Sequence, residues 1–287
     1  MELIRPLKQD HELLDDVHRW SQEHDHLHLW WLGQSGFLLM YRGQKILLDP
    51  YLSDSLTEKY AATDKPHLRM SARVINPELL TGISAVTSSH QHTDHLDAQT
   101  LLPLRAGNKD LVMIIPEAIR ALAAERLDGP STWPVGLDAG EKYEVGVFTF
   151  YAVPAAHNTL EKDEAGKHKY LGYVIKMGPW TVYHSGDTLW YEGMTALLKP
   201  WRINIALLPI NGDLPERRVA GNLNCREAAG LAKAIDAEVV IPCHYDMFKF
   251  NTANPKEFAY EAARIGQKFK VLRQGEHYST LELMGPA

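Results

Sequence analysis

The distribution of apolar residues along the chain predicts an α/β fold in which β-sheets are covered by helices. Short apolar runs of strand length recur from residue 27 onwards, and segments with helical spacing of apolar residues separate them. No short-period repeat, low-complexity tract or linker interrupts the 287 residues, which are enough to bury a large core. We therefore expect a single domain over residues 1–287.

The N-terminal segment is predicted to add a helix to this domain. Leu13, Leu14, Val17 and Trp20 recur at helical spacing in an otherwise charged stretch. Residues 1–26 are therefore interpreted as an N-terminal helical extension, which could lie at a subunit contact.

The first half of the chain then alternates between strands and helices. Apolar runs predict strands at residues 27–32, 36–41, 45–48, 83–86 and 111–115. Helical spacing predicts helices at residues 98–104 and 117–126. Arg42-Gly43 is expected to form a turn between two strands, whereas residues 66–76 look irregular.

The second half repeats the same style. Strands are predicted at residues 143–153, 171–177, 180–183, 203–208, 238–241 and 270–272. Helices are predicted at residues 225–235 and 255–269. This alternation is what favours sheets with helices on their faces.

Charge and composition argue against several classes of protein. The formal net charge is −6 and no segment is rich in Lys or Arg, so neither a nucleic-acid surface nor a membrane surface is expected. Cys225 and Cys243 are too few for a disulfide framework and suit a reducing compartment. The start lacks the apolar core of a signal peptide, and no run of about 18 apolar residues could span a bilayer. We expect a cytoplasmic protein that acts on a small molecule.

The segment His90-Gln91-His92-Thr93-Asp94-His95 carries four metal-ligating side chains directly after a predicted strand. In an extended segment residues two apart share a face, so His90 and His92 can hold one ion together. A sharp turn after them would let Asp94 and His95 face a second ion. Imidazole and carboxylate groups suit zinc, iron or manganese better than magnesium or calcium.

Three further ligands follow other predicted strands. His157, Asp187 and His244 each lie just beyond the C-terminal end of a strand, where side chains can converge on one edge of a sheet. Five histidines and two aspartates at four strand ends predict a two-metal hydrolytic site.

The order of these ligands resembles the signature of the metallo-β-lactamase superfamily, His-x-His-x-Asp-His followed by His, Asp and His. The resemblance runs from about Leu27 to the C-terminus, and within the superfamily the chain is most similar to the ascorbate-6-phosphate lactonase group. The segments that carry this likeness are Trp30-Trp31-Leu32-Gly33, His92-Thr93-Asp94-His95-Leu96-Asp97, Tyr183-His184-Ser185-Gly186-Asp187 and the stretch from Val239 to Asp246. The chain departs from that lactonase at His157, where the lactonase has an acidic residue. The resemblance implies a four-layer αββα sandwich.

The resemblance also implies roles for the ligands. His90, His92 and His157 would bind the first metal, Asp94, His95 and His244 the second, and Asp187 would bridge the two. The cofactors would be two divalent ions, zinc or manganese, with iron as a further candidate. A hydroxide between them would be the nucleophile, its pKa lowered from about 15.7 towards about 7, and Asp94 would orient it or transfer its proton. Zinc β-lactamases usually carry a cysteine at the position of Asp187, and oxygen-reducing di-iron relatives a glutamate at that of His92, so neither activity is expected.

Other residues are candidates to support the metals or to bind the substrate. Asp49 and Asp97 could each accept the free N–H of a ligating histidine and fix its tautomer. Tyr191, Asn211, Arg217, Arg218 and Tyr245 lie on loops near the predicted ligands, and the two arginines would suit a phosphate. Residues 211–224 contain glycine and proline and could form a flap over the site.

Three functions remain open from the sequence. The first is a hydrolase of a lactone or a related ester, which could be a sugar-phosphate lactone. The second is a phosphodiesterase of the ribonuclease Z or N-acyl phospholipid phospholipase D type, because Trp31-Leu32-Gly33-Gln34-Ser35-Gly36 resembles the phospholipase branch. The third, and least favoured, is a metal-binding protein without turnover. The lactonase likeness also suggests a homo-oligomer.

Overall fold

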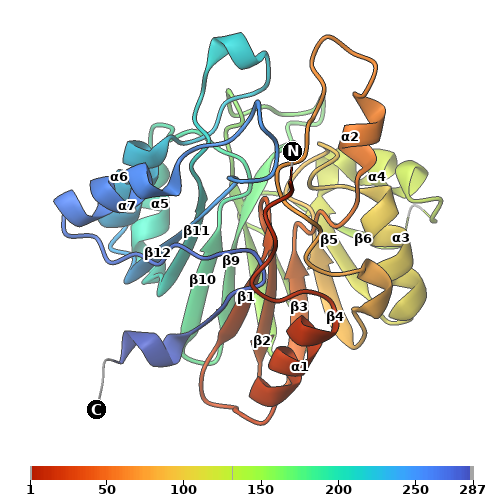
Figure 1. Cartoon of the computed structure of the whole chain (residues 1–287), viewed down its shortest axis with the longest axis horizontal. Coiled ribbons are helices and arrows are strands. Elements are labelled where there is room, and N and C mark those ends of the chain that lie inside the picture. The colour runs from red at the N-terminus through yellow and green to blue at the C-terminus, as the bar shows by residue number, and fades with distance from the viewer. Residues whose placement is uncertain (1, 131, 285–287) are drawn as a thin grey trace.

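Two β-sheets packed face to face form the centre of the molecule, and helices cover their outer faces (Figure 1). The structure is a computed structural model that describes residues 2–130 and 132–284. It confirms the four-layer α/β sandwich that the sequence predicts. In the described part of the chain, no helix is both long enough and apolar enough to cross a membrane.

The first sheet has seven strands in the order β13-β1-β2-β3-β4-β5-β6. These strands are His28–Gly33 (β1), Gly36–Tyr41 (β2), Gln44–Leu48 (β3), Ile83–Thr87 (β4), Val112–Pro116 (β5), Pro134–Leu137 (β6) and His277–Ser279 (β13). The second sheet has six strands in the order β12-β11-β10-β9-β8-β7. Its strands are Lys142–Val145 (β7), Phe148–Pro154 (β8), Leu171–Met177 (β9), Trp180–His184 (β10), Ile205–Pro209 (β11) and Val239–Cys243 (β12).

Seven α-helices surround the sheets. They are His11–Trp20 (α1), Ser55–Lys59 (α2), Ala98–Gly107 (α3), Arg120–Arg126 (α4), Met194–Leu198 (α5), Cys225–Ala234 (α6) and Pro255–Arg264 (α7), all within residues 2–130 and 132–284. Short 3-10 turns lie at Pro77–Leu79, Glu117–Ile119, Lys199–Trp201, Pro215–Arg217 and Thr280–Leu283. In Figure 1, α3 and α4 lie beside the first sheet, and α5, α6 and α7 beside the second.

The first sheet is apolar on both faces, because each face packs against another layer. Leu29 and Trp31 of β1 contact the core shared with the second sheet. Trp30 and Leu32 face the other way, into the core formed with α1, α3 and α4. Strands buried on both faces read as continuous apolar runs rather than alternating ones, which is why β1 and β2 stand out in the sequence.

Several predicted boundaries differ from the structure. The strand expected at residues 143–153 is two antiparallel strands, β7 and β8, because Gly146 has a positive φ of 57° and turns the chain back. The helix expected at 255–269 ends at Arg264, and Gly266 adopts a φ of 65° just beyond it. Residues 270–272 form no named strand, although the Lys270 N–H donates to the carbonyl oxygen of Val240. The short strands β6 and β13 and helices α2 and α5 carry no periodic signal and are not predicted from the sequence.

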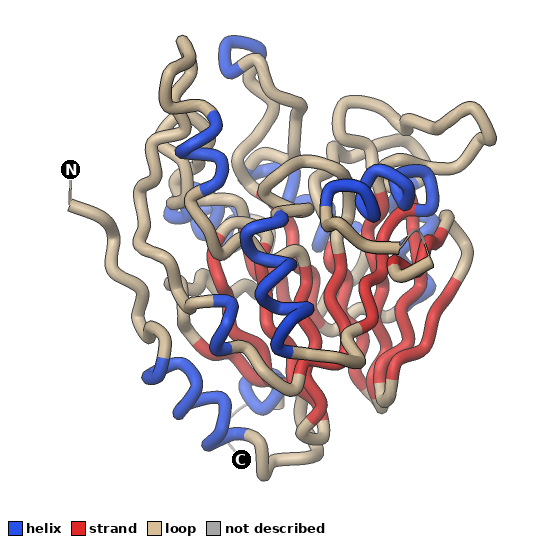
Figure 2. The backbone as a smooth tube through the Cα atoms, turned by 90° about the vertical axis from the view of Figure 1, so that its right-hand side faces the viewer, coloured by secondary structure: helices blue, strands red, loops and turns tan. Residues whose placement is uncertain are grey.

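The direction of the strands sets the position of the functional loops. β3, β4 and β5 run parallel in the first sheet, and β10, β11 and β12 run parallel in the second. Parallel strands end at the same edge of a sheet, so the loops that follow them gather together. Figure 2 shows these loops along the upper edge of the strands.

Helix α1 is attached to the first sheet through both apolar and aromatic contacts. Leu13 and Val17 are buried in the core on the outer face of that sheet. The ring of His277 in β13 packs against two indole rings, with its centroid 4.7 Å from that of Trp20 and 4.7 Å from that of Trp30. Its Nε2 is 3.0 Å from Nδ1 of His28. Burial and the neighbouring His28 lower the pKa of His277 to about 3.

Replacing His277 with glutamine should make the fold less sensitive to acid. An unfolded chain protonates this histidine near pH 6.5, whereas the folded protein keeps it neutral until about pH 3. Stability that His277 contributes above pH 6.5 is therefore lost as the pH falls towards 3, with a slope of at most about 1.4 kcal/mol per pH unit. Urea denaturation at pH values from about 7 to about 4 should show that the free energy of unfolding falls less in H277Q than in the native protein.

The matched control is H11Q, which removes an exposed histidine of α1. It should lose as much free energy of unfolding as the native protein over the same pH range. An equal loss in H277Q would show that His277 does not contribute to the acid sensitivity.

Candidate metal centre

The loops at one edge of the two sheets bring the seven predicted ligands together. The loop after β4 in the first sheet supplies His90, His92, Asp94 and His95. The ends of three strands in the second sheet supply the others, His157 after β8, Asp187 after β10 and His244 after β12. Five of the seven side chains are buried, and His92 and Asp94 are half-buried.

Three overlapping groups of these residues have ligand atoms within 4.8 Å of one another. The groups are His90, His92 and His157; His90, His95 and Asp187; and Asp94, His95 and His244. Asp187 lies between the first and the last group, because its carboxylate approaches a histidine of each. Its Oδ1 is 3.4 Å from His95 Nε2, and its Oδ2 is 3.6 Å from His157 Nε2 and 3.4 Å from His244 Nε2.

The histidine rings are held so that one nitrogen points into the centre of the site. Nδ1 of His95 is 2.7 Å from an oxygen of Asp49, Nδ1 of His157 is 2.8 Å from the carbonyl oxygen of Gly221, and Nδ1 of His90 is 3.0 Å from Oγ of Ser89. Donation from Nδ1 selects the tautomer that leaves Nε2 as a free lone pair. This is the form of imidazole that a metal ion needs.

The unpaired atoms at the centre fit a metal ion. Nε2 of His90, Nε2 of His95 and Oδ1 of Asp187 are buried and have no hydrogen-bond partner among the described residues. Leaving a buried polar atom without a partner costs about 1–3 kcal/mol, so several in one place indicate a missing partner. Nitrogen and carboxylate donors of this kind bind zinc, manganese or iron.

Burial and charge set the protonation of the ligands in agreement with this fit. Burial lowers the pKa of His90 well below its ordinary value and that of His92 to about 4, so both rings are neutral at pH 7. Burial would also lower the pKa of His95, but the carboxylates of Asp187 and Asp94 outweigh it and raise that pKa. The same negative charge that favours a proton on His95 favours a metal cation.

Asp49 fixes the loop that follows β4. Besides His95, it accepts hydrogen bonds from Oγ1 of Thr87 at 2.7 Å and from the backbone N–H of Ser89 at 3.1 Å. Complete burial opposes its ionisation, but the hydrogen bond with His95 and the neighbouring His184 lower the pKa of Asp49 to about 2. The carboxylate therefore stays charged and contacts Nδ1 of the candidate ligand His95, the side on which the sequence analysis expects a support. Asp97 differs from the prediction: within residues 2–130 and 132–284 its carboxylate forms no hydrogen bond with a candidate ligand, and it instead accepts from Thr100 Oγ1, 2.5 Å away, at the start of α3.

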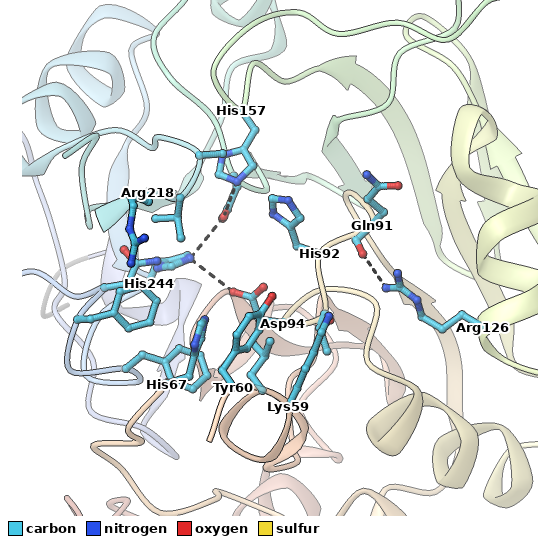
Figure 3. A pocket seen from close by; sticks show the side chains of 18 of the residues that line it. Lys59, Tyr60, His67, Gln91, His92, Asp94, Arg126, His157, Arg218 and His244 are labelled. Atoms are coloured by element: carbon cyan, nitrogen blue, oxygen red, sulfur yellow. Dashed lines mark hydrogen bonds and ion pairs between the residues drawn. The ribbon is translucent and has the colours of Figure 1, made fainter. Parts of the chain in front are cut away.

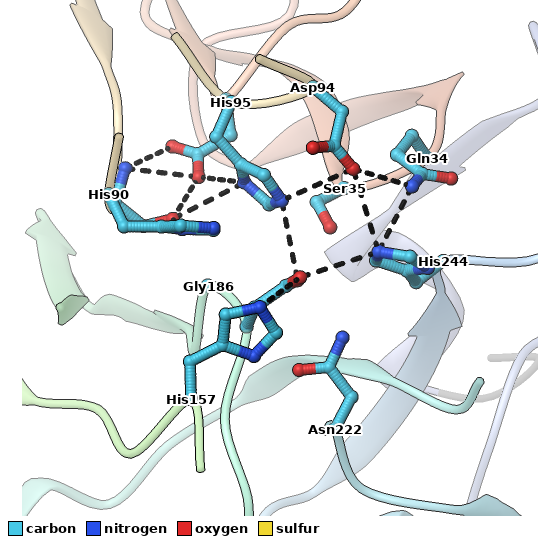
Figure 4. Close-up of polar contacts among 12 residues, drawn as sticks. Gln34, Ser35, His90, Asp94, His95, His157, Gly186, Asn222 and His244 are labelled. Carbon is cyan, nitrogen blue, oxygen red and sulfur yellow. Dashed lines mark hydrogen bonds and ion pairs between the residues drawn. The ribbon is translucent and has the colours of Figure 1, made fainter. Parts of the chain in front are cut away.

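Gln34, in the turn between β1 and β2, also belongs to the site. The sequence analysis names it only within the segment that resembles the phospholipase branch and not as a site residue. The residue is buried and has a positive φ of 49°. Its side-chain Nε2 donates to Oδ2 of Asp94 at 2.8 Å and lies 3.0 Å from Nε2 of His244 (Figure 4). Its carbonyl oxygen accepts from the His244 backbone N–H at 2.9 Å. A polar Gln34-Ser35 pair between two apolar strands is the signal that could have identified it.

A cavity of about 570 Å³ opens over the ligands (Figure 3). His92, Asp94, His157, Asp187 and His244 line its inner part. The rest of the lining comes from α2, α4 and four loops, and includes Leu56, Lys59, Tyr60, His67, Leu122, Arg126, Arg218, Val219, Phe248 and Phe250. The structure thus adds most of the outer cavity to what the sequence predicts.

Among the predicted substrate residues, Arg218 lines the cavity and the other four do not. Arg217 turns away because its guanidinium donates to the carbonyl oxygens of Asn211 and Thr252 and holds their loops together. Asn211 is buried and donates to Asn251 Oδ1 at 2.9 Å.

The two predicted tyrosines are used for packing. The Tyr191 hydroxyl donates to the carbonyl oxygen of Pro154 at 2.9 Å. Tyr245 is buried against Trp31, with ring centroids 4.3 Å apart, and its hydroxyl donates to the carbonyl oxygen of Leu272. Residues 211–224 do reach the cavity, through Arg218, Val219 and Ala220.

Comparisons with known proteins agree with this architecture. A family model described as "Beta-lactamase superfamily domain" matches residues 44–245. The chain is 29% identical over 251 residues to a UPF0173 metal-dependent hydrolase of Myxococcus xanthus, covering 85% of this chain and 78% of the relative. The metallo-beta-lactamase fold protein YhfI of Bacillus subtilis has a TM-score of 0.63 and 16% identity, over 89% of this chain and 99% of its own. An isothiocyanate hydrolase from Delia radicum gut bacteria has a TM-score of 0.69 and 21% identity, over 88% of this chain and 98% of its own.

Replacing Gln34 with leucine should weaken metal binding without unfolding the protein. The change keeps the approximate size of the side chain but removes the amide that contacts Asp94 and His244. Loss of an outer hydrogen-bonding partner typically lowers metal affinity about 10–100-fold. Chelator competition on Q34L, with elemental analysis, should show this loss, while Q99L, which changes an exposed glutamine of α3, should bind like the native protein. Native-like affinity in Q34L would mean that the amide does not position the ligands.

Proposed function

Since the chain belongs to the beta-lactamase superfamily, we propose that it is a metal-dependent hydrolase whose substrate is a lactone or a related ester. The observation that carries the proposal is the set of five histidines and two aspartates at the floor of an open cavity. Their unpaired nitrogen and oxygen atoms fit metal ions, and the cavity has room for a small organic molecule. The Myxococcus xanthus relative bears the name of a metal-dependent hydrolase, which supports the same reaction class.

The three groups of ligands suggest how the metals are shared. We assign His90, His92 and His157 to one ion and Asp94, His95 and His244 to a second, with Asp187 between them. Divalent cations bound there would polarise the carbonyl group of the substrate and lower the pKa of water from about 15.7 towards about 7. The donor set suits zinc or manganese, and iron is the third candidate.

Asp94 is the side chain that we assign to proton transfer. Both carboxylates line the cavity, but Asp94 is half-buried whereas Asp187 is buried among three histidines. Gln34 donates to Oδ2 of Asp94 and so fixes the orientation of the carboxylate. Oδ1 of Asp94 can then accept the proton of the attacking water and return it to the leaving oxygen.

Tyr170 and the His90 ring limit the site on the side of the second sheet. The two ring centroids are 5.3 Å apart, and Tyr170 is also 5.6 Å from the ring of His157. This packing restricts the orientation of the two candidate ligand rings.

Substitution of the ligands should abolish hydrolysis. H92A and D187A each remove a candidate metal ligand from the centre. The hydrolysis rate of both variants should fall by more than the roughly 10–100-fold expected when a hydrogen-bonding partner of a ligand is removed. Rates on a γ-lactone, measured with elemental analysis of each protein, test this expectation. H18A, which removes an exposed histidine of α1, should retain native activity and metal content. Full activity in H92A or D187A would refute the proposed mechanism.

A phosphodiesterase is the second candidate, because Lys59, Arg126 and Arg218 line the outer cavity and could hold a phosphodiester. A bis-aryl phosphodiester assayed beside a panel of lactones and aryl esters separates the two activities. Turnover of the phosphodiester alone would replace the lactonase proposal. Bound metal with no turnover of any substrate would favour a metal-binding protein.

A further inference from the structure

Three basic side chains from separate segments line the outer part of the cavity. They are Lys59 at the end of α2, Arg126 at the end of α4 and Arg218 in the loop before α6. The carboxylates that line the same cavity are Asp94 and Asp187, which both belong to the candidate metal ligands. Figure 3 shows Arg218 and Arg126 on opposite sides of His92 and Asp94, with Lys59 below Asp94 in this view.

The protein compensates the positive charge of these side chains only in part, through Asp97 near Arg126 and Asp64 beside Arg218. The half-buried Arg126 donates through Nη1 to the carbonyl oxygens of Gln91, 2.6 Å away, and Leu96, 3.2 Å away, which are neutral acceptors. Neither Arg126 nor Lys59 forms an ion pair within residues 2–130 and 132–284. Arg218 pairs with Asp64 at 2.8 Å, but both side chains are more than half exposed. Such an exposed ion pair contributes little to stability, so another anion can replace Asp64 as the partner of Arg218.

An apolar wall lies beside this basic group. Leu56 and Phe248 belong to a small buried cluster against which Tyr60 and Phe250 pack. Tyr60 stacks on His67 with ring centroids 4.1 Å apart, and His67 meets Phe250 edge-on at 4.5 Å. Because these rings are packed against one another, they form an aromatic wall, stacked at Tyr60 and edge-on at Phe250, that can contact a planar apolar group.

We propose that the substrate carries an anionic group, a carboxylate or a phosphate, together with a planar apolar group, and that Lys59 and Arg218 bind the anion. The proposal rests on the proposed function, because the reacting carbonyl must reach the ligand cluster at the floor. The Nζ atom of Lys59 lies 5.3 Å from the centre of the Tyr60 ring, so cation and apolar wall are adjacent. A molecule with both features satisfies the partly compensated charge and the apolar surface at once.

Matched aryl acetates test the proposal. The three esters carry a neutral carboxamide, a carboxylate or a phosphate on the ring. The charge of this substituent therefore differs while the reacting acetate ester is the same. The native metal-loaded enzyme should show kcat/KM at least about fivefold higher for one of the anionic esters, through a lower KM and less so at high salt. K59A and R218A should each reduce this preference, and the double variant should abolish it by lowering kcat/KM for the anionic esters to the level of the carboxamide ester.

The control K256A removes an exposed lysine of α7 and should keep the full preference. Arg126 is not substituted, because it also holds the backbone of the metal-ligand loop. Equal kcat/KM for all three esters, or a preference that survives in the double variant, would overturn the proposal. Whichever of the two anionic esters has the higher kcat/KM identifies the preferred anion as carboxylate or phosphate.

A binding measurement separates this proposal from the proposed function. Calorimetry with benzoate, phenylphosphonate and benzamide needs no turnover, so it can be performed even if no ester is hydrolysed. Tighter binding of an anion to the metal-loaded protein, lost in the double variant, would support the anion site while the hydrolase proposal fails. An anion preference unchanged in the double variant would assign it to the metals alone and reject Lys59 and Arg218.

Discussion

The common edge at which the parallel strands of both sheets end is the constraint on which the site depends. One loop of the first sheet carries His90 to His95, and three strand ends of the second sheet carry His157, Asp187 and His244. The two sheets face each other over a shared apolar core, so this core fixes the distance between the two sets of ligands. Stability of the fold and geometry of the site are therefore set by the same packing.

The site gathers more polar groups than an apolar core tolerates without compensation. Three carboxylates, those of Asp49, Asp94 and Asp187, lie within 3.8 Å of the nitrogens of the His95 ring. A proton on His95 balances part of this charge, and metal cations balance it more completely. Asp49 differs from the other two because its oxygens are occupied by Thr87 and Ser89, which makes it a fixed support rather than a ligand.

The sequence predicts the fold class and the seven ligands because both are encoded locally. Buried strands read as apolar runs, and a ligand directly after a strand must lie at the edge of its sheet. Gln34 and Lys59 come from a turn and a short helix, whose positions depend on tertiary packing and leave no periodic pattern. Arg217 and Arg218 are adjacent and chemically identical, yet the first is consumed by backbone carbonyls and the second lines the cavity. Composition cannot distinguish two such neighbours, because the φ of 52° at Arg218 redirects the chain between them.

Arg126 connects recognition at the outer cavity with the geometry of the metal centre. Its guanidinium lines the cavity, and the same Nη1 that donates to Gln91 and Leu96 spans the backbone that carries His92 and Asp94. A half-buried guanidinium interacts with such acceptors more strongly than an exposed one, so Arg126 stabilises this loop. Arg126 therefore lies both on the wall of the outer cavity and against the backbone of the ligand loop. Its position explains how a basic residue of α4 can support the site through the backbone of that loop.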